Sequence, residues 1–292
     1  MNRAITVSLF ALLVALVSSS CEEIGPNIDL GGPGRDATLA DTTYVAATVE
    51  APQTKNVLLE DFTGVRCKNC PLGAAQATSL LALYPERLIV IAQHSQFLNQ
   101  PYDGEPDLRI DESQDIETML APVLGKPSGA IDRRIFPGES VILQASVNKW
   151  ANLTTQALTE TTPVNIYIDK NWNSTTRNLT VTVTVHYTGT ETGENRLSVF
   201  LLEDNIVAAQ LQPDDEIDSN YVQRHVLRQM FTRFNGELLV GSKTPGTVFV
   251  KGFIIEGVDA AYNADELEVV AMVSRSAGSF QVLQVVGQKV VQ

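Results

Sequence analysis

The chain has 292 residues, of which 44% are hydrophobic and 19% charged, a composition typical of globular rather than disordered proteins. Its formal net charge of −13 argues against nucleic acid as a partner, because contacts to phosphate groups require a basic surface. The length is sufficient for two domains of ordinary size. Of the three cysteines, Cys21 stands alone, whereas Cys67 and Cys70 form a Cys-x-x-Cys motif.

Residues 1–20 are typical of the signal peptide of a bacterial lipoprotein. A basic residue precedes an apolar run over residues 5–17, which is too short to span a membrane comfortably, and small residues lead directly to Cys21. We expect Cys21 to be acylated and to anchor the protein to the membrane. Ordinary signal-peptidase cleavage, with Cys21 incidental, is the alternative. The acidic pair Glu22 and Glu23 resembles the signal that sends lipoproteins of Bacteroidota to the cell surface.

Residues 21–51 are predicted to form a flexible tether. The segment is rich in Gly, Pro, Asp and Thr and has no sustained apolar period. Near its end, residues 43–50 alternate enough to predict a short strand, which we expect at the edge of the first folded domain. That domain is predicted to span residues 52–160.

The Cys-x-x-Cys motif lies between a predicted strand and a predicted helix. A buried strand over residues 57–62 is followed by a turn with Gly64, then by Cys67 and Cys70, and a helix is expected to begin near Pro71. A cysteine at a helix N-terminus lies where backbone N–H groups and the helix dipole favour the thiolate, so its pKa falls. We therefore expect Cys67 to be the attacking thiol and Cys70 the resolving one.

This order of elements resembles that of thioredoxin-like proteins. An Asp-Phe pair beginning at Asp61 precedes Cys67, as such a pair precedes the first cysteine of thioredoxins. The buried aspartate of thioredoxins assists proton transfer, and the resemblance gives that role to Asp61. The sequence departs from the family at Arg66, where thioredoxins have Trp, and at Lys68–Asn69, where they have Gly-Pro.

The rest of the first domain follows the same pattern. We predict helices over residues 72–84, 111–124 and 140–159, and strands over residues 88–92 and 130–136. Thioredoxin-like domains carry a cis-proline just before this last strand, where it faces the cysteine pair and the backbone of the substrate. The resemblance makes Pro127 the candidate, and an ordinary trans-proline turn is the alternative.

The cysteine pair has three other interpretations. As a structural cross-link it is weak, because closing so short a loop contributes roughly 2 kcal/mol against roughly 4.7 kcal/mol for a 100-residue loop. As a zinc site it lacks a second Cys-x-x-Cys or a His-x-x-x-His, so no metal and no cofactor is expected. A resting disulfide within a thioredoxin-like fold stays open, because a fold does not determine function.

The pattern changes near residues 161–163. From there, alternating segments separated by turns predict strands over residues 164–168, 178–187, 196–202, 246–255, 267–274 and 281–286. Such spacing predicts an immunoglobulin-like antiparallel β-sandwich over residues 163–292. The predicted fold class is therefore α/β followed by β, with a thioredoxin-like domain and then an immunoglobulin-like domain.

A long segment, residues 204–234, interrupts these strands and contains Arg224, His225 and Arg228. These residues could contact an anionic ligand or an acidic partner, with His225 adding pH sensitivity. The alternative, which we favour, is structural. The two arginines would then pair with the nearby acidic run Asp214, Asp215 and Glu216.

Four features together resemble a lipoprotein family of Bacteroidota that is usually described as related to a 28-kilodalton outer-membrane protein. They are the lipoprotein signal, a Phe-Thr-Gly-x-x-Cys-x-x-Cys-Pro motif, a Pro-Ser-Gly-x-x-x-Arg segment and a late His-Val-Leu-Arg. The resemblance implies a location at the outer membrane, on the cell surface or facing the periplasm. It implies no settled reaction.

Two functions therefore stay open. The favoured one is a lipid-anchored binding or accessory protein that contacts an outer-membrane partner, because a surface lipoprotein lacks an obvious source of electrons. The alternative is a thiol–disulfide oxidoreductase for exported proteins. In that case Cys67 attacks, Cys70 resolves, Asp61 moves protons and Pro127 seats the substrate backbone.

Overall fold

The structure is a computed structural model that describes residues 39–276 and 278–291. These residues belong to one compact unit of the chain. The predicted signal peptide, Cys21, the acidic pair after it and most of the tether lie outside the described residues. Within the described ranges, no helix is long and apolar enough to cross a membrane.

The first part of the described chain folds as alternating strands and helices, as the sequence predicts. Its strands are β2 (Val57–Phe62), β3 (Leu88–Gln93) and β4 (Ser128–Ile131), and its helices are α2 (Cys70–Leu83), α3 (Asp111–Met119) and α4 (Val147–Ala157). β2 is parallel to β3 and antiparallel to β4. Val57 and Leu59 pack with α2 and α4, whereas Leu58 and Phe62 pack with α3. Both faces of β2 are buried, so apolar residues occupy four of its six positions, and the carboxyl groups of Glu60 and Asp61 are buried with them.

Three elements are shorter than predicted. α3 ends at Met119 rather than at residue 124, because Pro122 follows and proline cannot continue a helix. β4 ends at Ile131, because Asp132 and Arg133 have φ angles of 48° and 49°, in the left-handed region. α4 begins later than residue 140, since the segment before it bridges to β4 instead.

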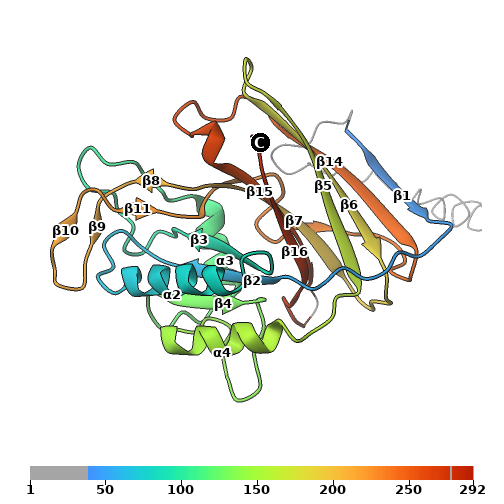
Figure 1. Cartoon of the computed structure of the whole chain (residues 1–292), viewed down its shortest axis with the longest axis horizontal. Coiled ribbons are helices and arrows are strands. Elements are labelled where there is room, and N and C mark those ends of the chain that lie inside the picture. The colour runs from blue at the N-terminus through green and yellow to red at the C-terminus, as the bar shows by residue number, and fades with distance from the viewer. Residues whose placement is uncertain (1–38, 277, 292) are drawn as a thin grey trace, which may run out of the picture. The chain divides into compact units, whose positions relative to one another are not determined.

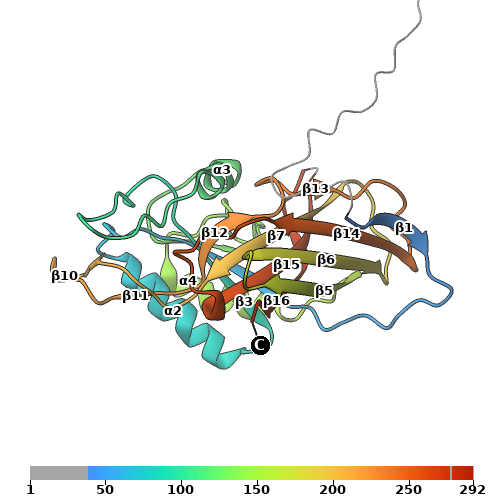
Figure 2. The same ribbon diagram turned by 90° about the horizontal axis from the view of Figure 1, so that it is seen from above.

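The later part of the described chain, which we call the β-rich part, contains all six predicted strands. They are β5 (Val164–Asn173), β6 (Asn178–Tyr187), β7 (Asn195–Glu203), β14 (Thr247–Ile255), β15 (Leu267–Arg275) and β16 (Val282–Lys289), with a short β13 (Glu237–Leu238) and a 3-10 turn η1 (Ala264–Glu266). Along most of β6, buried residues alternate with partly exposed ones, since successive side chains of a strand point to opposite faces. A four-stranded sheet has the order β1-β14-β6-β5, and its strands lie side by side in Figure 2.

The strand expected over residues 43–50 is present as β1 (Asp41–Val45), but its predicted place is wrong. β1 pairs antiparallel with β14 and forms the edge of the four-stranded sheet, rather than the edge of the first domain. An ion pair between Asp41 and Lys251 joins the two strands at 2.5 Å. A local alternation predicts a strand but not its partner.

The main sheet joins the two predicted domains. Its strand order is β16-β15-β7-β12-β3-β2-β4, with β13 beside β7. β12 (Val226–Met230) is antiparallel to β7 and parallel to β3, where Val226 pairs with Ala92. Phe62 of β2 and Phe200 of β7 belong to one buried cluster. The halves therefore share a buried core and a sheet, whose strands can be followed in Figure 1. Their separate folding remains a prediction.

Between β7 and β12 lies a segment of short strands, residues 204–225, which we call the insert. It contains β8 (Ile206–Val207), β9 (Gln210–Leu211), β10 (Ile217–Asp218) and β11 (Val222–Gln223), in which β8 pairs with β11 and β9 with β10. The insert extends from the β-rich part to the region where α2 begins (Figure 1).

Candidate redox site

Cys67 and Cys70 form a disulfide in the turn that leads into α2. Their Cα atoms lie 5.3 Å apart, and the residues are only 4% and 1% exposed. α2 begins at Cys70, with Pro71 in its first turn. The Cys70 N–H donates to the Cys67 carbonyl at 3.1 Å, which closes the turn. The pair therefore lies at the predicted strand-to-helix junction.

Both basic residues beside Cys67 are held by neighbouring loops. Arg66 donates from Nε to the Gln100 carbonyl at 2.6 Å and from Nη2 to the Pro101 carbonyl at 3.0 Å. Its guanidinium also lies 4.1 Å from the centre of the Tyr102 ring. Lys68 forms an exposed ion pair with Asp215 of the insert at 3.0 Å. Arg66 therefore binds the turn to the loop at residues 100–102, and Lys68 binds it to the insert.

The insert covers the turn from the other side. Gln210 donates from Nε2 to the carbonyl oxygens of Gly64, at 3.1 Å, and Cys67, at 3.2 Å. The Leu211 N–H donates to the Val65 carbonyl at 2.9 Å. These contacts explain why the disulfide is almost fully shielded from solvent.

Asp61 lies buried at the end of β2, and its carboxyl group is poorly satisfied. Oδ1 is buried without a hydrogen-bond partner among residues 39–276 and 278–291. Burial raises the pKa of Asp61 to about 7, although the positive charge of Lys126 acts in the opposite direction. A carboxyl group of this pKa changes its charge near neutral pH, as proton transfer at that pH requires.

The charge opposite Asp61 belongs to a buried network that the sequence analysis missed. Lys126 donates from Nζ to the Thr63 carbonyl at 3.1 Å and to Ser95 Oγ at 2.5 Å. Its Nζ also lies 3.5 Å from Glu117 Oε1, and Ser95 Oγ donates to Glu117 Oε2 at 2.6 Å. Burial lowers the pKa of Lys126. The available signal was the position of Lys126 directly before Pro127.

The Lys126–Pro127 peptide bond is cis, as predicted from the resemblance. Pro127 packs directly against α2 at Gly73, where an added Cβ would lie only 2.9 Å from Pro127 Cβ and 3.1 Å from the Trp150 ring. Only a residue without a side chain allows this close approach. Pro127 thus contacts α2 three residues after Cys70.

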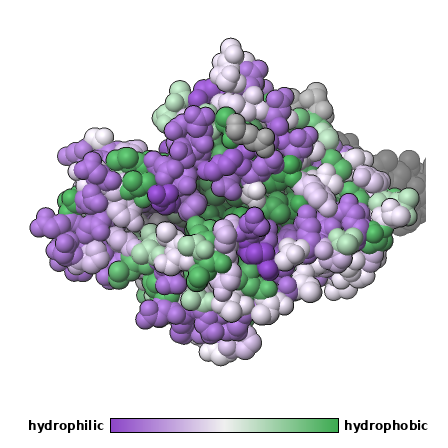
Figure 3. Space-filling model, in the orientation of Figure 1, coloured by the Kyte–Doolittle hydropathy of each residue, from purple (hydrophilic) through white to green (hydrophobic). Residues whose placement is uncertain are grey.

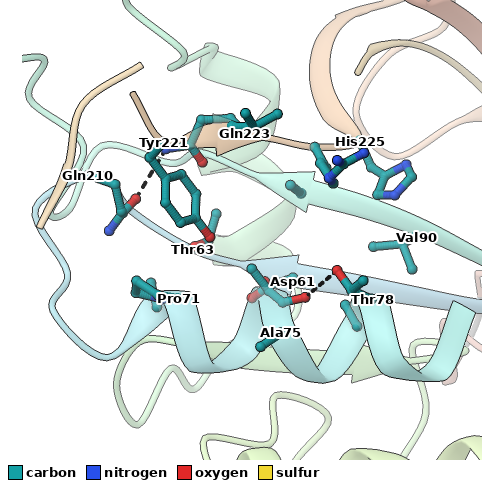
Figure 4. Close-up of a pocket in the computed structure, with 16 residues that line it drawn as sticks. Asp61, Thr63, Pro71, Ala75, Thr78, Val90, Gln210, Tyr221, Gln223 and His225 are labelled. Carbon is teal, nitrogen blue, oxygen red and sulfur yellow. Dashed lines mark hydrogen bonds between the residues drawn. The ribbon is translucent and has the colours of Figure 1, made fainter. Parts of the chain in front are cut away.

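A cavity of about 370 Å³ lies between α2 and the insert. Asp61 and Cys70 both line it, which brings two of the predicted site residues together. In Figure 4, the Tyr221 ring reaches from the insert towards Thr63 and Asp61. The full lining is Asp61, Thr63, Cys70, Pro71, Ala74, Ala75, Ala77, Thr78, Val90, Ala92, Gln210 and Tyr221, Val222, Gln223, Arg224 and His225.

Arg224 of the insert and Arg228 of β12 have other partners than predicted. Arg228 Nε lies 3.3 Å from Glu203 Oε2, and its guanidinium stacks on Tyr262. Arg224 Nη1 lies 4.0 Å from Asp204 Oδ2. The predicted pairing with residues 214–216 is therefore wrong, because that acidic run turns towards the start of α2. Arg228 therefore links β12 to β7 through Glu203. The Arg224 side chain is half-exposed and lines the cavity between α2 and the insert.

Known structures share this fold. HBP35 of Porphyromonas gingivalis matches with a TM-score of 0.63 at 18% identity, over 82% of this chain and 76% of HBP35. A protein from Agrobacterium tumefaciens matches with a TM-score of 0.51 at 12% identity, over 83% of this chain and 97% of that protein. At these identities the likeness concerns the fold alone. The chain matches none of the curated proteins.

The family comparison extends over more than half of the chain. The family model of outer membrane protein Omp28 matches residues 121–292, which include β4, α4, the insert and the whole β-rich part. The resemblance read from the lipoprotein signal and the three motifs is thereby confirmed. The chain belongs to the family of outer membrane protein Omp28, and its location is the outer membrane.

Proposed function

We propose that this outer-membrane protein carries out thiol–disulfide exchange on exported proteins through Cys67 and Cys70. The observation that carries the proposal is that Cys70 and the buried Asp61 line the same cavity. Cis-Pro127, packed on α2 near the pair, supports a thioredoxin-like domain over residues 52–160. The antiparallel pairing of the later strands supports an immunoglobulin-like domain over residues 163–292.

In the proposed reaction, the Cys67 thiolate attacks one sulfur of a substrate disulfide. The substrate's other sulfur leaves as a thiolate and takes a proton from water. The Cys70 thiol then gives its proton to the Asp61 carboxylate, and the Cys70 thiolate attacks Cys67 Sγ. This step forms the Cys67–Cys70 disulfide and expels the substrate's second sulfur as a thiolate. That thiolate takes the proton from Asp61, so the substrate leaves as a dithiol and Asp61 is a carboxylate again. Two electrons pass to the substrate, and the reverse sequence oxidises a substrate dithiol.

The experiment is mixed-disulfide trapping with reduced protein and a disulfide-bonded model substrate. Cys70→Ser should accumulate a covalent complex through Cys67, because the resolving thiol is absent. Cys67→Ser is the matched control and should trap nothing. Equal absence of trapping and turnover in both variants would overturn the proposal.

A second candidate is a binding or accessory protein with a resting disulfide. The specific observation in its favour is the shielding of Cys67 by Gln210 and Leu211 of the insert. Partner contacts would then come from the β-rich part and the insert. Measurement of the reduction potential separates the two, since a potential below about −300 mV is typical of structural disulfides.

A further inference from the structure

The cavity beside Cys70 has an apolar floor that continues beyond the redox pair. Its lining includes Ala74 and Ala77 of α2 together with Val90 and Ala92 of β3. Figure 3 shows hydrophobic residues within a hollow on this side, bordered by hydrophilic ones. The cavity volume of about 370 Å³ falls within the range of small-molecule sites, which run from about 300 to 1,000 Å³.

The polar groups of the cavity lie at different places along it. Asp61 and Thr63 line it beside Cys70, and Tyr221 reaches towards them. Arg224 and His225 are contributed by the insert. The pKa of His225 is lowered, mainly by burial, which disfavours its cationic form. The cavity therefore offers one cationic side chain, Arg224.

The guanidinium of Arg224 is accessible to a ligand. Its side chain is 50% exposed, and its ion pair with Asp204 is long, at 4.0 Å. A guanidinium presents several N–H donors in a planar arrangement that matches a carboxylate. In a chain of net charge −13, a half-exposed arginine that lines a cavity with apolar walls is complementary to a molecule with an apolar body and one negative group.

We propose that this cavity binds a small amphipathic carboxylate. Its apolar body would lie between Ala74 of α2 and Tyr221, over Val90 and Ala92, and its carboxylate would pair with Arg224. Pro127 does not line the cavity, so the ligand site is separate from the side of α2 against which the cis-proline packs. Ligand binding at this cavity needs no reduced cysteine, so it is a function distinct from thiol–disulfide exchange.

The test uses oxidised protein and two ligands with the same apolar body, 1-naphthoate and its neutral amide, 1-naphthamide. Calorimetry should show that the carboxylate binds more tightly by about fivefold, as expected for a half-exposed ion pair. Arg224→Gln should remove this preference. Lys149→Gln is the matched control, since Lys149 is an exposed cation on α4 that does not line the cavity.

A second pair of variants tests the cavity itself. Ala74→Leu should fill it and weaken both ligands at least tenfold. Ala82→Leu, exposed on the same helix outside the cavity, should leave binding unchanged. Leu and Ala have similar helix propensities, so α2 should persist in both variants. Binding that survives Ala74→Leu, or a carboxylate that binds no better than the amide, would overturn the proposal.

Thiol–disulfide exchange and ligand binding can be tested independently of each other. A Cys67→Ser variant has no redox pair, and Cys67 does not line the cavity, so Cys70, Arg224, Ala74 and the apolar floor are all retained. It should bind 1-naphthoate within about twofold of the wild type, a difference small against the tenfold that corresponds to 1.4 kcal/mol. Loss of binding in this variant would contradict a site independent of the disulfide.

Discussion

Gln210 Nε2 donates a hydrogen bond to the Cys67 carbonyl oxygen at 3.2 Å, across a sequence separation of 143 residues. The same nitrogen reaches the Gly64 carbonyl at 3.1 Å. One amide group of the insert thus binds the turn that carries the disulfide at two positions, Gly64 and Cys67. Access to the redox pair is therefore set by a residue that belongs to neither β2 nor α2.

Gln210→Ala should make the disulfide easier to reduce. Losing a hydrogen bond of about 1 kcal/mol between the insert and the turn should favour opening by about fivefold. The measurement is the rate of reduction by a small phosphine. Gln212→Ala is the control, because the hydrogen bond from the Gln212 side chain to the Gln210 carbonyl is long, at 3.4 Å, and does not reach the turn. An unchanged rate for Gln210→Ala would show that the insert does not limit access.

Asp61→Asn should change how stability depends on pH. The folded-state pKa of Asp61 is raised by burial from 3.8 to about 7, so the unfolded chain releases this proton first as the pH rises. Wild-type stability relative to the variant should therefore fall between about pH 4 and pH 7. At 1.36 kcal/mol per pKa unit, the variant should be more stable by about 4 kcal/mol at pH 8.

Chemical denaturation at pH 4 and pH 8 measures this difference. At pH 4 the folded wild type carries a neutral carboxyl group, so the two proteins should be close in stability. The rate of thiol–disulfide exchange should also lose its titration near pH 7 in Asp61→Asn. A stability difference that stays constant from pH 4 to pH 8 would mean that Asp61 titrates normally.

Glu60→Ala should strongly destabilise the fold. Arg133 donates from Nε and Nη2 to the two oxygens of Glu60, each at 2.6 Å, and both side chains are buried. Removing one partner leaves a buried charge uncompensated, which costs about 3–5 kcal/mol. The exposed pair Lys149–Glu139 is the control, and its removal should change the free energy of unfolding by less than about 1 kcal/mol.

A fragment beginning at Thr161 tests the predicted domain boundary. We expect it to retain β structure, because β5, β6, β14 and β15 pair among themselves or with β7. It should be less stable than the whole chain, since it loses β3 beside β12 and exposes Phe200 and Leu202. Circular dichroism and urea denaturation measure both properties. A helical spectrum, or a midpoint equal to that of the full chain, would contradict this expectation.

Cys21→Ala tests the proposed lipid anchor. If acylation of Cys21 holds the protein at the outer membrane, the variant should lose labelling by a fatty-acid analogue and appear in the soluble fraction. Replacement of the neighbouring Glu22 by Gln keeps Cys21 and should preserve labelling. Full membrane retention of Cys21→Ala would rule out the anchor.

Local signals predicted much of the fold and part of the site. The apolar residues 57–59, the cysteine spacing and the alternation in β6 depend on neighbours in sequence, and each led to the correct element. Pro127 was found because its resemblance to a cis-proline segment is also local. These patterns determine which residues form strands and helices, but they leave the pairing of distant strands open.

The missed features are contacts between distant residues. β1 pairs with β14, and Gln210 reaches Cys67, although no local period identifies either partner. Arg228 pairs with Glu203 on the adjacent strand rather than with the acidic run that is closer in sequence. Cross-strand neighbours can be far apart along the chain, so sequence proximity was the wrong criterion for that pair.

The position of β12 between β3 and β7 has a consequence for biogenesis. A chain that is exported from its N-terminus presents β2 and β3 long before residues 226–230 arrive, and the free edge of β3 cannot be covered until then. Unpaired strand edges are templates for association with other chains. We therefore expect the newly exported protein to need protection by a periplasmic chaperone until its late strand completes the sheet.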